Sequence, residues 1–292
     1  MGNHGRRLVR WLALAACVIT PGAGLVAQIT REAPAAPPLP SAAPDLRPVF
    51  SQQRPILDVL AEERRRHVLD ATGLTLYERV TTGWQATRSW PVTPPAPWPR
   101  DLRGMLSFSV DTVEVFLPNL RCSKSATGSD LRCQPVARGW KMPLPRDEPF
   151  ELRGNRFVAP DGLEFYSLIA LSVPTAGASY LAGTTDGFLT LLDADRKPVA
   201  RMMPGDDAVL LVGGCRDEPY VLVRMDADGG DALAVFQVRD RAMREVAPRR
   251  PVQGRVTALW SDGGDIRSGR VVIRAADAER YDAYEIAVAC VR

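Results

Sequence analysis

The alternation of apolar and polar residues is clearest between Pro219 and Val288, where one pattern occurs twice. Each copy has an apolar run ending in arginine, an aspartate-bearing turn, and a second run centred on an aromatic residue. The runs are Tyr220–Arg224 and Ala234–Val238, then Arg270–Arg274 and Asp282–Ile286. The copies lie about 48 to 50 residues apart, which indicates a repeat architecture.

Elsewhere, short runs of period two predict β-strands. The segment Ile56–Leu69 also fits a helix, but Gly73 and Gly83 cut its surroundings into hairpin-sized units, so strands are preferred. The region Arg138–Leu163 is rich in proline and has no regular pattern. The predicted strands outside the twin pattern are Pro55–Leu60, His67–Asp70, Leu74–Tyr77, Trp84–Trp90, Met105–Ser109, Thr112–Leu117, Phe165–Val173, Ser179–Ala182, Phe188–Leu192, Val199–Met202, Asp207–Val212 and Arg255–Trp260.

Groups of three or four strands at this spacing match the strand content of β-propeller blades. We predict an all-β fold, a propeller of about six four-stranded blades within residues 46–292. The last group lacks a fourth strand, and Leu46–Gln52 near the N-terminus is expected to supply it. The alternative is two all-β domains that meet near Gly162.

The first 45 residues have a different composition. Arg6, Arg7 and Arg10 precede an apolar stretch and then small residues, as in a secretory signal peptide spanning 1–27. Residues 28–45 form a Pro/Ala-rich linker. Alternatively, Leu14–Cys17 resembles a lipobox, and an acylated Cys17 would anchor the protein. No later stretch is long and apolar enough for a transmembrane helix.

Four cysteines follow Cys17, and an even number in an exported chain favours disulfides. Cys122 and Cys133 flank a polar, turn-like segment, so a bridge that closes this hairpin is predicted. Cys215 and Cys290 would then join the two copies of the repeat. Four reduced thiols or a zinc site are the alternatives, although no Cys-x-x-Cys motif is present.

The chain has 37 basic and 34 acidic residues, a net charge of +3. This balance gives no electrostatic case for a nucleic-acid partner. Lysine occurs only at Lys124, Lys141 and Lys197, so nearly all of the positive charge is arginine.

The motif closest to a binding site is Asp226-Ala227-Asp228-Gly229-Gly230-Asp231, which precedes a predicted strand. Alternating aspartate and glycine can present oxygen ligands to calcium. The segment resembles the aspartate loop of secreted FG-GAP (integrin-α-like) propeller repeats, and residues 46–292 more broadly resemble secreted bacterial propeller proteins. The resemblance implies a calcium site at Asp226, Asp228 and Asp231. An ordinary Asp/Gly hairpin turn is the alternative, and no other cofactor is expected.

Enzymatic interpretations find little support in the sequence. Serine or cysteine catalysis would depend on His67, the only histidine after the signal peptide, which is interpreted as a surface or packed residue. The carboxylates of Asp147, Glu148 and Glu164 show no spacing typical of an acid/base pair. Among the aromatic residues, Trp98 and Trp140 lie in proline-rich connectors and are the candidates for exposed ligand contacts.

The sequence therefore predicts a monomeric, extracytoplasmic (periplasmic, secreted or cell-surface), non-catalytic module that binds a protein or a glycan. A propeller hydrolase or lyase that uses carboxylates and a metal ion is the first alternative. The second is an outer-membrane lipoprotein scaffold for envelope assembly, anchored through Cys17.

Overall fold

The computed structural model describes residues 43–92, 104–109, 111–117, 120–125, 128–136, 151–153, 156–159, 161–175, 178–204, 209–212, 220–239, 241–261, 268–276 and 279–287. All of them belong to one compact unit, Pro37–Arg292. Within these ranges the regular structure is entirely β, and no helix could span a membrane. The signal peptide, most of the linker and Cys17 lie outside the described residues.

Two four-stranded antiparallel sheets come first along the chain after β1. Sheet 1 is a meander of β2 (Ile56–Ala61), β3 (Arg65–Asp70), β4 (Gly73–Val80) and β5 (Gly83–Pro91). Sheet 2 is a meander of β6 (Met105–Ser109), β7 (Thr112–Leu117), β8 (Leu120–Ser125) and β9 (Arg132–Pro135). In β4, Gly73 has a φ of +141°, and a Cβ there would lie 2.2 Å from the Trp90 carbonyl oxygen, so this close strand approach requires glycine.

Two larger antiparallel sheets follow. Sheet 3 has six strands in sequence order, which are β10 (Glu151–Arg153), β11 (Arg156–Val158), β12 (Glu164–Thr175), β13 (Ala178–Thr184), β14 (Phe188–Leu192) and β15 (Pro198–Pro204). Sheet 4 contains β16 (Val209–Val212), β17 (Tyr220–Ala227), β18 (Gly230–Arg239), β19 (Ala242–Glu245) and β20 (Arg250–Val252), and both β19 and β20 pair with β18.

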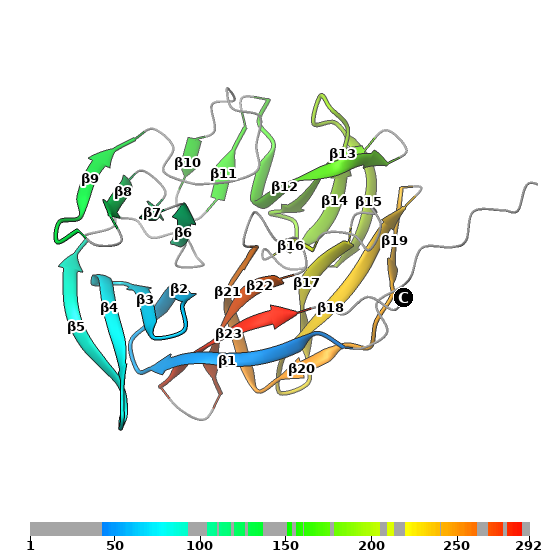
Figure 1. Ribbon diagram of the computed structural model, residues 1–292. Helices are drawn as coiled ribbons and strands as arrows, with labels where there is room; N and C mark the ends of the chain where they lie inside the picture. Colours follow the sequence, from blue (N-terminus) through cyan, green and yellow to red (C-terminus); the bar gives the residue numbers. More distant parts are fainter. Residues whose placement is uncertain are drawn as a thin grey trace, which may run out of the picture. The chain divides into compact units, whose positions relative to one another are not determined.

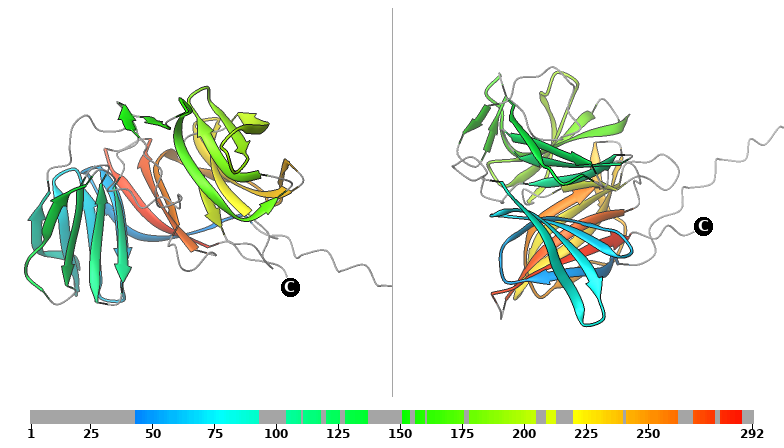
Figure 2. Two further views of the ribbon diagram at one scale, coloured as in Figure 1. Left: turned by 90° about the horizontal axis from the view of Figure 1, so that it is seen from above. Right: turned by 60° about the vertical axis from the view of Figure 1, so that its left-hand side comes forward.

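Sheet 5 joins the two ends of the described chain. It has the order β1 (Asp45–Gln52), β23 (Tyr281–Ala287), β22 (Ser268–Ala275) and β21 (Gly254–Ser261). Strand β1 is antiparallel to β23 from Asp45–Ala287 to Gln52–Tyr281. Figures 1 and 2 show the blue β1 alongside the red β23. The prediction that a strand near Leu46–Gln52 completes the last sheet is confirmed.

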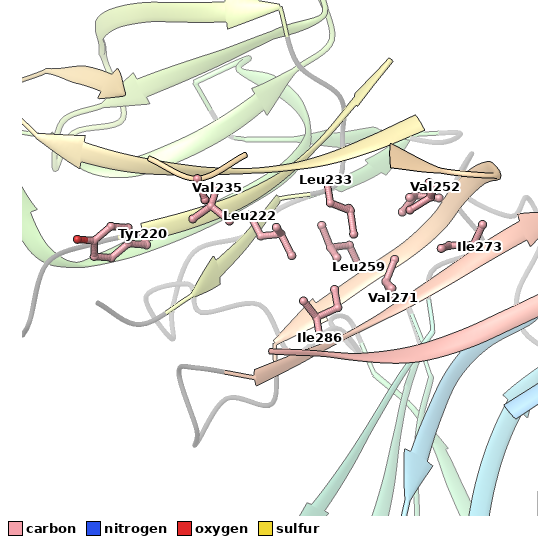
Figure 3. Packing of buried hydrophobic residues seen from close by; sticks show 11 residues of the cluster. Tyr220, Leu222, Leu233, Val235, Val252, Leu259, Val271, Ile273 and Ile286 are labelled. Atoms are coloured by element: carbon pink, nitrogen blue, oxygen red, sulfur yellow. The ribbon is translucent and has the colours of Figure 1, made fainter. Parts of the chain in front are cut away.

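The core lies between the faces of successive sheets. Apolar residues of sheet 4 and sheet 5 interdigitate, with Leu222 and Leu233 on one side and Val271 and Ile286 on the other (Figure 3). Comparable clusters join sheet 3 to sheet 4, sheet 5 to sheet 1, and sheet 1 to sheet 2. Strands such as β2, β17 and β18 are therefore buried on both faces, which explains their near-continuous apolar runs.

These contacts bear on the two predicted architectures. Strands from the beginning and the end of the chain share sheet 5 and a common core with sheet 1. Two independent domains divided near Gly162 do not fit this arrangement. The described residues form five sheets where about six four-stranded blades were predicted, so the blade number stays a prediction.

The Cys122–Cys133 disulfide is present, as predicted. The two cysteines are directly opposite each other in β8 and β9. The bond therefore closes the hairpin that ends sheet 2. Cys215 and Cys290 lie outside the described residues, and their pairing stays a prediction.

Candidate functional site

The Asp226–Asp231 turn joins β17 to β18, and its three carboxylates have different surroundings. Asp226 and Asp231 face each other in the strand register, and Nη1 of Arg255 lies 2.9 Å from Oδ1 of Asp226 and 3.2 Å from Oδ1 of Asp231. Asp228 lies in the turn itself. No set of three or more histidine, cysteine or acidic residues in the described ranges could hold a metal ion. Here a guanidinium from β21 supplies the positive charge, and the calcium interpretation stays a prediction.

Asp231 is the most buried of the three, with a fully inaccessible side chain. Its Oδ2 accepts a hydrogen bond from the backbone N–H of Val256 at 2.7 Å. Burial raises the pKa of Asp231, while this hydrogen bond and the nearby Arg224 and Arg255 oppose the rise. Asp231 therefore joins sheet 4 to β21 of sheet 5.

An open hollow of about 490 Å³ lies beside this turn. Three of its lining residues are glycines, so no side chains from these positions fill the hollow. A Cβ at Gly230 would come within 2.6 Å of the Val252 carbonyl oxygen, and one at Gly254 within 2.1 Å of the Arg274 carbonyl oxygen. We call this the turn hollow; its lining residues are Ala227, Gly229, Gly230, Gly254, Arg255, Arg274, Ala275, Ala276 and Glu279.

Charged groups of both signs line the turn hollow. Arg255 and Arg274 are directly opposite each other on β21 and β22, an arrangement that is unfavourable for like charges unless anions balance it. Asp226 and Asp231 balance Arg255, but no ion pair of Arg274 occurs among the described residues. Arg274 is exposed and can donate hydrogen bonds to a ligand in the hollow.

Asp231 and Arg224 form a clamp on one residue of the neighbouring sheet. Asp231 accepts the N–H of Val256, and Nη1 of Arg224 donates to the carbonyl oxygen of the same residue at 2.8 Å. Both side chains are buried. The clamp holds the start of β21 against sheet 4, and thereby fixes one wall of the turn hollow.

A second clamp of the same design holds Leu106 in β6. Asp58 accepts the N–H of Leu106 at 2.7 Å, and Nη2 of Arg270 donates to the Leu106 carbonyl oxygen at 3.0 Å. Arg270 also makes a bidentate ion pair with Asp58, at 2.7 and 2.8 Å. Burial raises the pKa of Asp58. The ion pair with Arg270 and the hydrogen bonds from two backbone N–H groups oppose that rise. One residue pair thus joins sheets 1, 2 and 5.

A second open hollow, also of about 490 Å³, lies beside sheet 3 and includes Glu164, Asp186 and Arg201 in its lining. Arg201 pairs with Asp186 at 2.9 Å and stacks on the ring of Phe188 at 3.5 Å. The carboxylate that shares this hollow with Glu164 is therefore already paired with an arginine. Asp147 and Glu148 lie outside the described residues.

His67 is a packed residue at the interface of sheets 1 and 2. It is 2% exposed, and its Nδ1 lies 3.4 Å from Glu62 without a hydrogen bond. Burial, then Lys124 and Arg65, lower the pKa of His67 to about 4. His67 is therefore neutral near pH 7, and the described residues place no nucleophile in hydrogen-bond contact with it.

The tryptophans with described positions are mostly structural. Trp260 donates from Nε1 to the Leu57 carbonyl oxygen at 3.1 Å, and Trp90 donates to that of Ser129 at 2.6 Å. The guanidinium of Arg66 stacks on Trp84 at 4.2 Å. The two predicted ligand-contacting residues, Trp98 and Trp140, lie outside the described residues.

The sequence reasoning missed both clamps. Asp58 interrupts the apolar run Ile56–Leu60, and such an isolated acidic residue in a buried strand is the signal that could have identified it. Its partner Arg270 is 212 residues away, and no local pattern connects the two.

Comparisons with known proteins do not identify a family for this chain. No protein-family model and no curated protein matches the sequence. Solved structures that are similar to it include S. cerevisiae core factor (8% identity, TM-score 0.35, 82% of this chain and 48% of that one), BBS1N in complex with ARL6DN (9%, 0.39, 85% and 98%) and KlHsv2 with loop 6CD replaced (12%, 0.35, 76% and 78%).

The chain thus spans less than half of the core-factor chain. BBS1N and KlHsv2 are β-propeller proteins. All three TM-scores are below 0.5, so these likenesses carry no argument, and the architecture described above depends on the strand pairings.

Proposed function

We propose that this protein is a non-catalytic binding module that holds a protein or glycan partner at the turn hollow. The observation that carries the proposal is the composition of this hollow, which combines bare glycine backbone with charged groups of both signs. Hydroxyl and amide groups, which glycans and peptides present in series, need such closely spaced donors and acceptors.

The individual groups have complementary roles. Arg274 offers guanidinium donors, and Glu279 offers carboxylate acceptors on the facing turn. Arg255 is already held by Asp226 and Asp231, so it is pre-positioned and little side-chain entropy is lost when a ligand binds. A rigid wall beside an exposed arginine favours recognition without a large conformational change.

The proposal includes a β-propeller architecture with about six blades, the last completed by β1. Four consecutive sheet-to-sheet cores and the pairing of β1 with β23 support it. A rigid stack of sheets with variable turns is a scaffold suited to binding. We further propose that the protein is a monomer that acts outside the cytoplasm; the N-terminal sequence, which is typical of an export signal, supports this location.

The experiment measures binding of the mature protein to a glycan array and, in the producing cells, photo-crosslinking from a residue placed at Ala276. Ala276 lines the hollow and is exposed. Arg274→Ala should weaken array binding or crosslinking about tenfold, as expected for the loss of a charge-assisted hydrogen bond.

Arg244→Ala is the matched control, because Arg244 is exposed on β19 and does not line the hollow. A crosslinking residue at Ala86, exposed on β5, controls for nonspecific capture. Equal losses with Arg274→Ala and Arg244→Ala would show that binding does not use the turn hollow.

A further inference from the structure

Lys124 is a buried cation at the interface between sheets 1 and 2. It belongs to β8, it is only 3% exposed, and its ammonium group lies 5.0 Å from the centre of the Trp90 ring. The guanidinium of Arg88, on β5, approaches the same ring at 5.8 Å. Two cations therefore share one aromatic ring.

Neither cation has an anionic partner within the described part of the chain. No hydrogen bond or ion pair of Lys124 or Arg88 occurs there. A largely buried lysine is destabilised unless its charge is balanced, and a second cation nearby adds repulsion. Burial and then Arg88 lower the pKa of Lys124, which shows the direction of this cost.

The charged residues around Lys124 and Arg88 limit how much additional negative charge can bind between them. Glu62 already acts on Lys124 from a distance, and its carboxylate lies 3.4 Å from Nδ1 of His67. Arg65 is balanced by Glu78 at 3.5 Å. One additional negative charge would balance the remaining cations, whereas a dianion would carry a larger desolvation cost into this interface.

The geometry points to a carboxylate-binding site formed by Lys124 and Arg88 against the ring of Trp90. The ring is fixed by its hydrogen bond to Ser129, in the hairpin that the Cys122–Cys133 disulfide closes. A carboxylate accepts hydrogen bonds from both cations, and its apolar part packs on the indole. The site does not include any residue of the turn hollow.

The rarity of lysine makes a direct test possible. The full mature chain, labelled with carbon-13 lysine, gives signals from Lys124, Lys141 and Lys197 only, and substituting each lysine assigns them. Sodium acetate is added at constant ionic strength against sodium chloride. We expect acetate to shift the Lys124 signal saturably and to raise the pKa of Lys124, because an anion favours the charged form.

Arg88→Gln should raise the acetate concentration for half-saturation about tenfold. Arg244→Gln, the same charge change on a different sheet, should leave the half-saturation concentration unchanged.

Saturation by acetate supports a free small carboxylate as ligand, and tighter saturation by a glutamate-containing peptide supports an acidic side chain of a partner. A Lys124 signal that responds to neither, or an unchanged Arg88→Gln titration, would overturn the proposal, and tighter binding of inorganic phosphate would overturn the carboxylate assignment.

Discussion

The Asp58 and Asp231 clamps apply one design in two different surroundings. Each aspartate accepts the backbone N–H of a residue in a strand of another sheet. In each case an arginine donates to the carbonyl oxygen of that same residue. Asp58 is fully enclosed with Arg270, whereas Asp231 directs its second oxygen to Arg255, which is 66% exposed. The same carboxylate contact therefore lies in the interior at Asp58 and borders the open turn hollow at Asp231.

This difference has a physical consequence. A buried ion pair that loses one partner leaves an uncompensated charge in a low-dielectric interior, whereas an exposed partner is solvated by water. The Asp58 clamp should therefore tolerate substitution less well than the Asp231 clamp.

The largest expected effect is that of Asp58→Asn. It leaves Arg270 buried without its counter-ion and should lower the free energy of unfolding by about 3–5 kcal/mol. Asp231→Asn should cost about 1–2 kcal/mol, because asparagine can still accept the Val256 N–H and Arg255 is solvated. Denaturant titrations of both variants measure the difference. Equal losses would show that the two clamps do not differ in their dependence on burial.

A matched double variant separates the ion pair from its desolvation cost. Asp58→Leu combined with Arg270→Met removes both charges and should be less destabilised than either single variant. Additive losses in this double-mutant cycle would contradict direct coupling between Asp58 and Arg270.

The next effect concerns pH and the interface between sheets 1 and 2. The pKa of folded His67 is about 4, below its ordinary value of 6.5, so the unfolded chain takes up the proton first as the pH falls. Neutral His67 therefore imposes no cost on folding above about pH 6.5. The free energy of unfolding should decline by about 2 kcal/mol between pH 7 and pH 5. Unfolding titrations at several pH values measure it, and His67→Leu should remove this part of the slope. An unchanged slope in His67→Leu would assign the pH dependence to other groups.

The smallest expected effect is that of calcium on the Asp226–Asp231 turn. Because Arg255 already supplies positive charge to Asp226 and Asp231, a chelator should change the melting temperature by less than about 1 °C. Thermal unfolding with calcium and with a chelator tests this, and Asp228→Ala is the control. A rise of several degrees on adding calcium, lost in Asp228→Ala, would instead support the calcium loop implied by the FG-GAP resemblance.

Local patterns were sufficient to predict much of the fold. Predicted strands such as Phe188–Leu192 and Thr112–Leu117 agree with β14 and β7. The role of Leu46–Gln52 followed from the missing fourth strand of the last group. Strands β10 and β11 were not predicted, because their three-residue runs lie in a proline-rich region without a readable period.

The candidate site was predicted less completely, for a physical reason. The Asp/Gly alternation identified the turn, but the charge that meets Asp226 and Asp231 comes from Arg255, in the next sheet. Likewise, Lys124 of β8 reaches Trp90 of β5 only after sheets 1 and 2 have packed. Contacts between sheets depend on tertiary packing, which a single sequence read segment by segment does not reveal.

The pairing of β1 with β23 has a consequence for the order of folding. Ser51 and Asp282, which share a hydrogen bond of 2.6 Å, are 231 residues apart. The strand that is synthesised first therefore has to wait, unpaired, until the last strand has emerged. Contacts of such long sequence separation form slowly. Once formed, the pairing of β1 with β23 must break before sheet 5 can unfold.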